Sequence, residues 1–381
     1  MTPSSPPAWS PKLIVDAHLD LAYNVLGWQR DYRRSARWNR RREAGAPAER
    51  ENGQCCVGLP ELVRGQVGIV FGTIFVEPSQ RRSADRPMTY RDEQEAHALG
   101  MAQLDFYRRW PEQEPHVKLI GSQRDLSDVL NTWGLQSDAS GRLTVLPDRQ
   151  TPAIHPVGIV PLMEGADPIL EPKELERWVE RGVRIVGPAW HRTRYSAGSD
   201  APGGLTNLGR ELLEVIAQLG VVLDVSHMAH RALFEALDTF EGKHIIASHS
   251  NPYRIVPDER HLPDPAIEAI AERGGVIGIV LYNKFLQRGW GTGSKKRDVT
   301  LDDVVRAIDH VCQVTGSANY VGIGSDFDGG LGARQIPWEM DSSRDLGKIG
   351  AELARRGFDP DDVDKIMGGN WLRILRAALP D

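Results

Sequence analysis

The sequence lacks the features that mark secreted or membrane-anchored proteins. It contains only three cysteines in 381 residues, and this small, odd number argues against a disulfide-bridged fold. The Pro- and Ser-rich start of the chain holds no apolar segment of signal-peptide length. No apolar run reaches the ~18 residues that a membrane-spanning helix needs. We therefore expect a cytoplasmic protein that does not attach to a membrane.

A strong excess of charge of either sign is also missing. The net charge is −6, with 26% charged and 40% apolar residues, which is ordinary for a soluble globular chain. This mild acidic excess gives no reason to expect a nucleic-acid partner. The exception is an Arg-rich stretch at residues 27–52. We interpret it as a solvated loop or short helix inserted after the first strand, not as a nucleic-acid patch, and its position would allow a role as a lid or substrate contact.

The chain does contain a regular alternation of short apolar runs and helical stretches. The runs that predict strands cover residues 13–16, 66–76, 158–163, 183–186, 221–225, 244–247, 276–281 and 320–324. Such runs are typical of buried parallel strands. With right-handed crossovers, eight strands favour a closed (β/α)8 barrel of the TIM type, in the α/β class, with inserted loops on its catalytic face. No linker divides the chain, so we expect one domain over residues 1–381, with its core at 12–376.

Helices are predicted between and after these strands. The longer ones are expected at residues 89–109, 122–131, 206–219 and 301–315. Ser122 and Asp359 are predicted N-caps, and Pro360 after Asp359 suits the first helical position. The polar stretch at 135–156 predicts a small hairpin.

Side chains of metal-binding types stand at the ends of five of the apolar runs. They are His18, Asp20, Glu164, His227, His249 and Asp326. In a closed parallel barrel all strand C-termini open on one face, so these side chains should converge. Each alone is weak evidence, because single histidines and carboxylates are often structural. Together they predict a metal site, since burying so much polarity without a metal would be costly.

The number of candidate ligands is larger than the number that one tetrahedral zinc ion binds. They suit two metals bridged by a carboxylate, with Glu164 as the bridge, because each of its oxygens can bind one metal. A hydroxide delivered by the metals would attack a carbonyl, and Asp326 would pass the proton to the leaving nitrogen. The alternative role for Asp326 is a helix N-cap after the eighth strand. The pattern predicts a metal-dependent hydrolase.

Seven short motifs resemble, in the same order, those of the membrane dipeptidase (renal dipeptidase) family of binuclear zinc peptidases. The matching stretches are Asp16–Leu21, Met163–Ala166, Gly203–Thr206 with Gly209–Glu211, Asp224–His227, Ser248–Asn251, Gly324–Gly329 and Gly368–Arg373. They span nearly the whole chain, and the ordered set is specific although each stretch alone is weak. The resemblance is to a bacterial-type member and implies a barrel that hydrolyses dipeptides with two zinc ions per chain.

The resemblance also implies which residues hold each metal. His18, Asp20 and Glu164 would hold one zinc ion, and Glu164, His227 and His249 would hold the other. The bridging position of Glu164 agrees with the interpretation made from the residues alone.

Two further positions are implied for the substrate. Asp326 takes the place of the acid/base that also meets the substrate ammonium group. Arg260 stands where the family binds the substrate carboxylate, in the stretch Arg260–Asp264, which departs from the family pattern at His261. A guanidinium fork suits a carboxylate.

The loop after the fourth strand departs from the family pattern. Where the family has a substrate-binding histidine, an alignment anchored on Gly182–Arg184 puts Trp190, with His191 one residue later. Either His191 fills that role, or Trp190 replaces it with an apolar or stacking surface. The family usually has Gly and Asn on either side of the first histidine ligand, where this chain has Ala17 and Leu19. Neither change prevents His18 from binding a metal.

Three functions are compatible with these observations. The first is a binuclear zinc dipeptidase of broad specificity, including a D-residue on the C-terminal side. The second is a related metal-dependent amidohydrolase acting on a non-dipeptide amide or lactone, and the third is a non-catalytic binding protein on a barrel. The expected partners are small peptides, with no nucleic acid and no membrane, and a homodimer is the candidate assembly.

Overall fold

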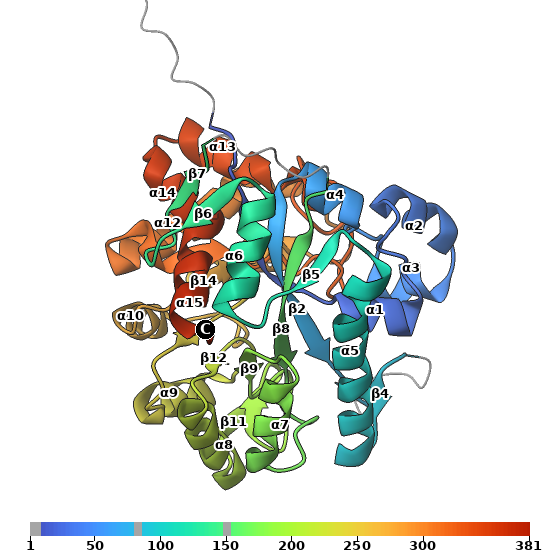
Figure 1. The fold of residues 1–381 in the computed structure, drawn as a ribbon, viewed down its shortest axis with the longest axis vertical. Helices are drawn as coiled ribbons and strands as arrows, with labels where there is room; N and C mark the ends of the chain where they lie inside the picture. Colours follow the sequence, from blue (N-terminus) through green and yellow to red (C-terminus); the bar gives the residue numbers. More distant parts are fainter. Residues whose placement is uncertain (1–8, 80–85, 148–153) are drawn as a thin grey trace, which may run out of the picture.

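Eight parallel strands form a barrel at the centre of the molecule (Figure 1). The computed structural model describes residues 9–79, 86–147 and 154–381, and its strands follow the order β13-β12-β9-β8-β2-β1-β15-β14. A parallel bridge between Ala247, directly after β13, and Ile277 in β14 joins the two ends of this order. The bounds are β1 Ile14–Leu19, β2 Val67–Phe75, β8 Val157–Glu164, β9 Ile185–Gly187, β12 Val222–Asp224, β13 Ile245–Ile246, β14 Ile277–Ile279 and β15 Val321–Ile323. The predicted (β/α)8 barrel is confirmed.

Helices lie around the outside of the strands (Figure 1). In α8 (Asn207–Gln218) the side chains of Leu212, Leu213 and Ile216 are buried, because apolar residues at this spacing share the face that meets the barrel. The other helices are α1 Leu21–Trp28, α2 Ala36–Glu43, α3 Pro47–Asn52, α4 Leu59–Arg64, α5 Glu93–Gln113, α6 Gln123–Thr132, α7 Leu175–Glu180, α9 His230–Thr239, α10 Asp264–Glu272, α11 Asn283–Leu286, α12 Leu301–Thr315, α13 Gly347–Arg355, α14 Pro360–Asp364 and α15 Asn370–Ala378.

Side-chain caps decide where several of these helices begin. Ser122 accepts a hydrogen bond from the N–H of Asp125 at the start of α6, and Asp359 accepts one from Asp361 at the start of α14, so both predicted N-caps are confirmed. The predicted start of a helix at residue 89 is wrong. Asp92 caps α5 instead, and the residues before it form the short strand β4 (Thr89–Tyr90).

Short strands outside the barrel account for the other differences from the sequence analysis. The predicted hairpin is β6 (Leu135–Ser137) paired antiparallel with β7 (Leu143–Val145), and residues 148–153 of that stretch lie outside the described residues. Two features were not predicted: β5 (Val117–Leu119), which pairs with β8, and the hairpin of β10 (Ser196–Gly198) and β11 (Ala201–Leu205). Strand β3 (Glu77–Pro78) pairs with β4.

The Arg-rich stretch is more ordered than a solvated loop. It contains the end of α1 followed by α2 and α3, and Arg30 within it is 1% exposed. Arg30 forms ion pairs with Glu43 and with Asp328, which follows the last strand of the barrel. The stretch is helical, as the short-helix alternative expected, but its interpretation as solvated is wrong for Arg30, because the charge of Arg30 is satisfied by buried carboxylates.

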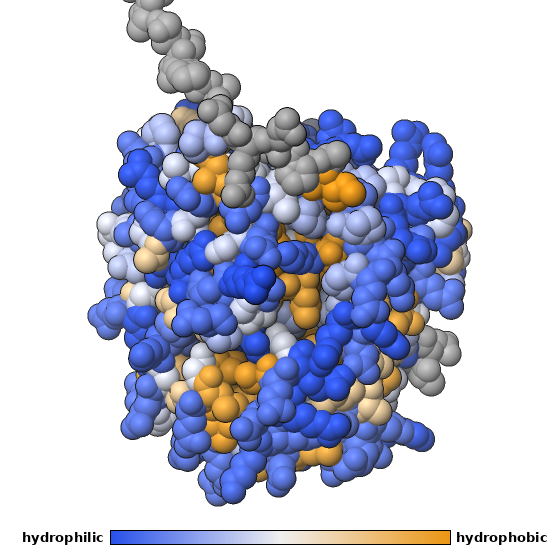
Figure 2. Space-filling model, in the orientation of Figure 1, coloured by the Kyte–Doolittle hydropathy of each residue, from blue (hydrophilic) through white to orange (hydrophobic). Residues whose placement is uncertain are grey.

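The outer surface is mostly polar. On the face in Figure 2, hydrophilic side chains cover most of the molecule, and apolar residues show between the outer elements. Within the described ranges, no helix combines the length and apolar character needed to cross a lipid bilayer. The interpretation of residues 1–381 as one domain stays a prediction.

The barrel seam between β13 and β14 leaves no room for a side chain at Gly278. A Cβ atom there would lie 1.9 Å from the carbonyl oxygen of Ser248, which belongs to the backbone and cannot rotate away. We expect Gly278→Ala to lower the free energy of unfolding by at least the ~1–3 kcal/mol typical of overpacking, measured by urea unfolding. Gly291→Ala is the control, because a Cβ at Gly291 meets no atom within 4 Å. Equal unfolding midpoints for the two variants would contradict this account.

Candidate metal centre

The six predicted site residues lie together at the C-terminal ends of the barrel strands. His18 is near the end of β1, Asp20 follows that strand, and Glu164 is the last residue of β8. His227, His249 and Asp326 each lie three residues beyond the end of a strand, namely β12, β13 and β15. All are buried except Asp326 and His227, which are partly exposed to the cavity described below.

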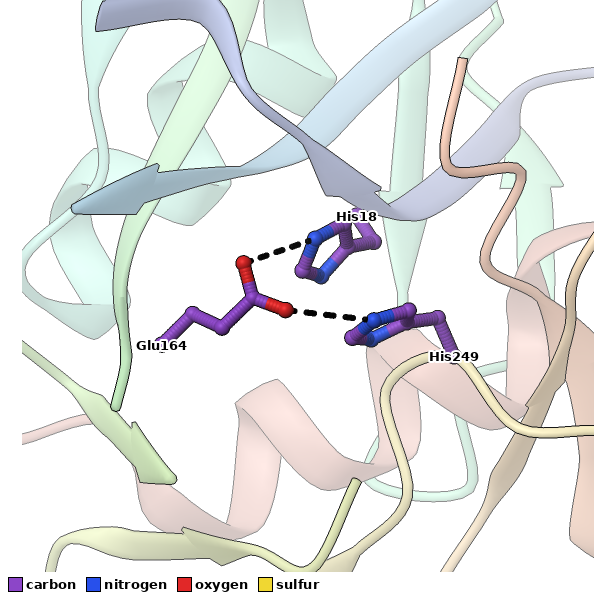
Figure 3. Close-up of side chains that lie close together, drawn as sticks. All are labelled: His18, Glu164 and His249. Atoms are coloured by element: carbon purple, nitrogen blue, oxygen red, sulfur yellow. Dashed lines mark ion pairs between the residues drawn. The ribbon is translucent and has the colours of Figure 1, made fainter. Parts of the chain in front are cut away.

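Glu164 lies at the centre of this group (Figure 3). Its Oε2 is 3.5 Å from Nε2 of His18, and its Oε1 is 3.1 Å from Nε2 of His227 and 3.3 Å from Nε2 of His249. Each oxygen thus has its own imidazole neighbour, although the rings of His18 and His249 stack on one another with centroids 3.5 Å apart. This is the geometry that a bridging carboxylate requires.

The atoms around Oε1 have the spacing of ligands that share one metal. Nε2 of His227 and Nε2 of His249 are 3.0 Å apart, and each is within 3.3 Å of Oε1 of Glu164. Tetrahedral zinc bonds of about 2.0–2.1 Å place ligand atoms about 3.3 Å from one another. The donor set of two imidazoles and one carboxylate fits zinc in spacing and in type.

His18 connects this cluster to the remaining carboxylates. Ligand atoms within 4.8 Å of one another form two groups: His18 with Glu164 and His249, and His18 with Asp20 and Asp326. Nδ1 of His18 is buried and has no hydrogen-bond partner among the described residues. A buried imidazole whose ring nitrogens lack ordinary partners is readily explained as a metal ligand.

A hydrogen-bond chain sets the tautomer of His249. The hydroxyl of Ser248 donates to Oδ2 of Asp224 (2.5 Å), so its oxygen is left to accept from Nδ1 of His249 at 2.9 Å. Nδ1 therefore carries the proton, and the lone pair of Nε2 points at Glu164 and His227. Such outer partners orient imidazole ligands in metal sites. Sequence reasoning missed this role of Asp224 and Ser248, although both are polar residues within or next to an apolar run.

Charge is unevenly distributed among the site residues. Burial would raise the pKa of Glu164, but the charge of His18 and the close approach of the imidazoles of His18, His227 and His249 hold that pKa well below its usual range. Burial would lower the pKa of His18, but the carboxylates of Glu164, Asp20 and Asp326 raise it to about 10. Burial lowers the pKa of His227 to about 4, which leaves it neutral and able to bind a metal.

The two aspartates lack sufficient positive charge nearby. Burial and the charge of Glu164 raise the pKa of Asp20 to about 7. Burial also raises the pKa of Asp326 well above its usual range. The negative charges of Asp20 and Glu164 raise this pKa further, whereas the positive charges of His18 and Arg260 lower it. Three buried carboxylates therefore compete for few cations, a situation that divalent metal ions would relieve.

A cavity of about 290 Å³ opens over these residues. Its aromatic wall consists of Tyr23, Phe75, Trp190, Tyr282 and Phe285, and the sequence analysis identified only Trp190 among them. Tyr23, Phe75 and Phe285 belong to α1, β2 and α11, where the sequence does not distinguish a cavity residue from a core residue. The Arg-rich stretch reaches the cavity through Asn52 alone among the described residues.

Arg260 lies in the cavity wall and is held by two hydrogen bonds. Its Nη1 donates to the hydroxyl of Ser250 (2.8 Å) and its Nη2 to the carbonyl of His249 (2.6 Å). The guanidinium also lies 5.8 Å from the ring centroid of Phe285. Its position is thus fixed next to a proposed metal ligand, where a cationic group can meet the anionic end of a bound molecule.

Trp190 and His191 point to different surroundings. Trp190 lines the cavity, with its ring centroid 4.8 Å from that of Phe75 and 6.2 Å from that of His227. His191 is not among the cavity residues, and its Nδ1 lies 2.7 Å from the carbonyl oxygen of Ser199. Ser199 in turn places its hydroxyl 3.0 Å from Nδ1 of His227.

Comparison with known families matches most of the chain. The profile of the membrane dipeptidase family (peptidase family M19) matches residues 148–379, which include Glu164, His227, His249 and Asp326. Dipeptidase tcpJ of Claviceps purpurea is 33% identical over 329 residues, covering 84% of this chain and 68% of the relative. An uncharacterised protein in the pqqA 5′ region of Klebsiella pneumoniae is 32% identical over 215 residues, covering 54% of this chain and 76% of the relative.

A solved structure has the same fold over nearly the full length. A metallopeptidase from Rhodobacter sphaeroides, bound to a phosphinate mimic of the dipeptide L-Ala-D-Ala, superposes with a TM-score of 0.74. The superposition covers 97% of this chain and all of the other, at 22% sequence identity.

Proposed function

Because the chain belongs to the membrane dipeptidase family (peptidase family M19), we propose that it is a zinc dipeptidase that hydrolyses the amide bond of dipeptides with two metal ions per chain. The observation that carries this proposal is Glu164, whose two oxygens contact different imidazoles: Oε2 faces His18, and Oε1 faces His227 and His249. A single buried carboxylate with separate ligand neighbours at each oxygen is suited to bridging two metals.

The residues of the site fit zinc in type and spacing. His18, Asp20 and Glu164 would hold one ion, and Glu164, His227 and His249 would hold the other. Bound zinc ions would polarise the scissile carbonyl and lower the pKa of the water that attacks it. Nε2 of His18, which faces the carboxylates of Asp20 and Glu164 at 3.8 and 3.5 Å, and the close pair of Nε2 atoms of His227 and His249 support this arrangement.

Three groups of this chain would act on the peptide itself. Asp326 lines the cavity next to His18 and would carry a proton to the leaving nitrogen, for which its raised pKa is appropriate. Arg260 would bind the substrate carboxylate. Trp190 and Phe75 would pack on a side chain of the substrate and exclude water from the reacting bond.

The substrate class follows from the size and charge of the cavity. Its volume suits a dipeptide, with the cation Arg260 available for one end and the carboxylate Asp326 for the other. The Rhodobacter sphaeroides enzyme carries a mimic of L-Ala-D-Ala, which supports including L,D-dipeptides among the substrates tested. Hydrolysis of another amide or of a lactone, with no dipeptide cleaved, would favour the amidohydrolase alternative.

The metal content is the first test of the proposal. Protein never exposed to a chelator should contain about two zinc-type ions per chain, measured by mass spectrometry of the metals. Glu164→Gln should reduce both, because Glu164 would contact both ions, whereas His227→Ala should mainly remove one. His191→Ala is the matched control and should retain both ions, because His191 does not line the cavity. A wild-type content of zero would overturn the proposal.

The role of Asp326 can be separated from metal binding. Asp326→Asn should retain both metals but lose kcat by roughly 10²–10⁴-fold, as expected for a positioned acid/base. Steady-state hydrolysis of dipeptides and a metal analysis of the same preparation test this together. Loss of a metal ion would show that Asp326 is a ligand, as its grouping with His18 and Asp20 allows, and near-normal turnover would show that it is structural.

The departure from the family after β9 generates a paired prediction. Indole offers one donor and no acceptor, so Trp190 can line the pocket but cannot replace the hydrogen bonding of an imidazole. Trp190→Ala should raise KM for dipeptides with large apolar side chains more than for small ones, while His191→Ala should change little. The reverse ranking, with His191→Ala abolishing turnover, would assign the family's histidine role to His191.

A further inference from the structure

The loop after β15 has a backbone that needs support from its surroundings. Asp326 and Asp328 both have left-handed backbones, with φ values of 60° and 66°. Residues other than glycine rarely adopt this conformation and hold it only where neighbouring contacts determine it. The source of those contacts therefore bears directly on where the Asp326 carboxylate points.

Within the described part of the chain, the carboxylate of Asp328 is bound by residues in and just after the Arg-rich stretch, including the thiol of Cys55 at 3.3 Å. Nη1 of Arg30 forms an ion pair with its Oδ2 at 3.1 Å, and the hydroxyl of Tyr32 donates to the same oxygen at 2.9 Å. The backbone N–H of Cys56 donates to Oδ1 at 2.5 Å. Arg30, Tyr32 and Asp328 are all almost completely buried. Buried, charge-assisted contacts of this kind restrict motion strongly.

The carbonyl of Asp328 is held as well. The side-chain amides of Asn24 and Asn52 both donate to it at 3.0 Å. Asn24 also donates to the carbonyl of Asp20 at 2.8 Å. A single amide group therefore links the end of β1, which carries a proposed metal ligand, to the loop that carries Asp326.

The two segments also meet through their backbones. The N–H of Ala333 donates to the carbonyl of Gln54 at 3.0 Å. Gly53 and Gly332 pack so closely that a Cβ on Gly332 would lie 2.1 Å from the backbone nitrogen of Gln54. The two segments therefore meet at both ends of this loop, at Asp328 and at Gly332–Ala333.

We propose that Arg30 and Asp328 are a positioning pair, through which the Arg-rich stretch holds the loop of Asp326 in its reactive conformation. Arg30 is suited to this because its guanidinium reaches three groups at once: Glu43 through Nε at 3.1 Å, Asp328 through Nη1, and the carbonyl of Gly53 through Nη2 at 2.6 Å. A planar fork can satisfy these directions together, which a lysine cannot. As an account of turnover, this pair rests on the proposed function.

The same stretch supplies a matched control. Arg40 also anchors it, by donating to the carbonyl of Cys55 at 2.6 Å and by pairing with Asp341 at 2.8 Å. Among the described residues, no hydrogen bond or ion pair joins Arg40 to Asp328. Arg30→Met and Arg40→Met therefore remove the same type of side chain from the same stretch, and only the first removes a direct contact with Asp328.

The experiment compares dipeptide hydrolysis, metal content and backbone hydrogen exchange in these two variants. Arg30→Met should lower kcat at least tenfold, because displacements of the reacting groups by about 1 Å cost on the order of 10²-fold, while KM changes less than about twofold and both metals stay bound. Amide exchange in residues 326–331 should accelerate. Arg40→Met should leave kcat within about twofold of wild type and exchange in this loop unchanged.

Two results would overturn the proposal: a folded Arg30→Met variant with wild-type kcat and exchange, or an equal fall of kcat in both variants. If Arg30→Met does not fold, Asp328→Asn tests the same pair, because it removes the negative charge that Arg30 meets and keeps one of the two acceptor oxygens. If the wild-type protein hydrolyses no dipeptide, the proposed function fails separately. In that case faster exchange in residues 326–331 of Arg30→Met alone still supports the positioning pair, and unchanged exchange overturns it.

Discussion

A buried carboxylate surrounded by imidazoles is the constraint on which the site depends. Glu164 is 5% exposed at the end of β8, and three imidazole nitrogens lie within 3.5 Å of its two oxygens. Burial of an ionised group is costly unless its partners are fixed around it. The closed barrel provides this fixation, because it brings the ends of β1, β8, β12 and β13 to one face with little freedom to move apart.

The same pair of hydrogen bonds, from a serine to an aspartate, joins neighbouring strands at two places in the barrel. Asp16 of β1 accepts from both the N–H and the hydroxyl of Ser325, which follows β15, at 2.8 and 2.5 Å. Asp224 of β12 accepts in the same way from Ser248, which follows β13, at 2.9 and 2.5 Å. In each case the serine directly precedes a proposed site residue. In both places an aspartate within one strand thus fixes the serine that precedes a site residue after the adjacent strand, as supporting hydrogen bonds do in other metal sites.

The Arg-rich stretch contributes stiffness more than charge to this design. Its most buried arginine, Arg30, forms ion pairs with the internal carboxylates of Glu43 and Asp328, and Arg40 forms an ion pair with Asp341. Neither guanidinium is free to attract an anionic partner, although the stretch is basic in composition. Only Asn52 from this stretch borders the cavity among the described residues, so its influence on a substrate would pass mainly through the loop of Asp326.

The sequence by itself determined the barrel and the composition of its metal-type cluster. Apolar runs predict strands, and a closed parallel barrel has one face for all strand ends, so His18, Glu164 and His249 could be brought together without knowing any loop. Tertiary structure alone decided which side chain after β9 faces the cavity. A shift of one residue in the loop exchanges Trp190 and His191, and the sequence has no periodic pattern in a loop that would fix which of them points inward. Tertiary structure also decided that Arg30 is buried, since an arginine in a basic, polar stretch looks solvated until a carboxylate 298 positions later, Asp328, is folded against it. Such pairings depend on long-range packing, which periodicity along the chain does not encode.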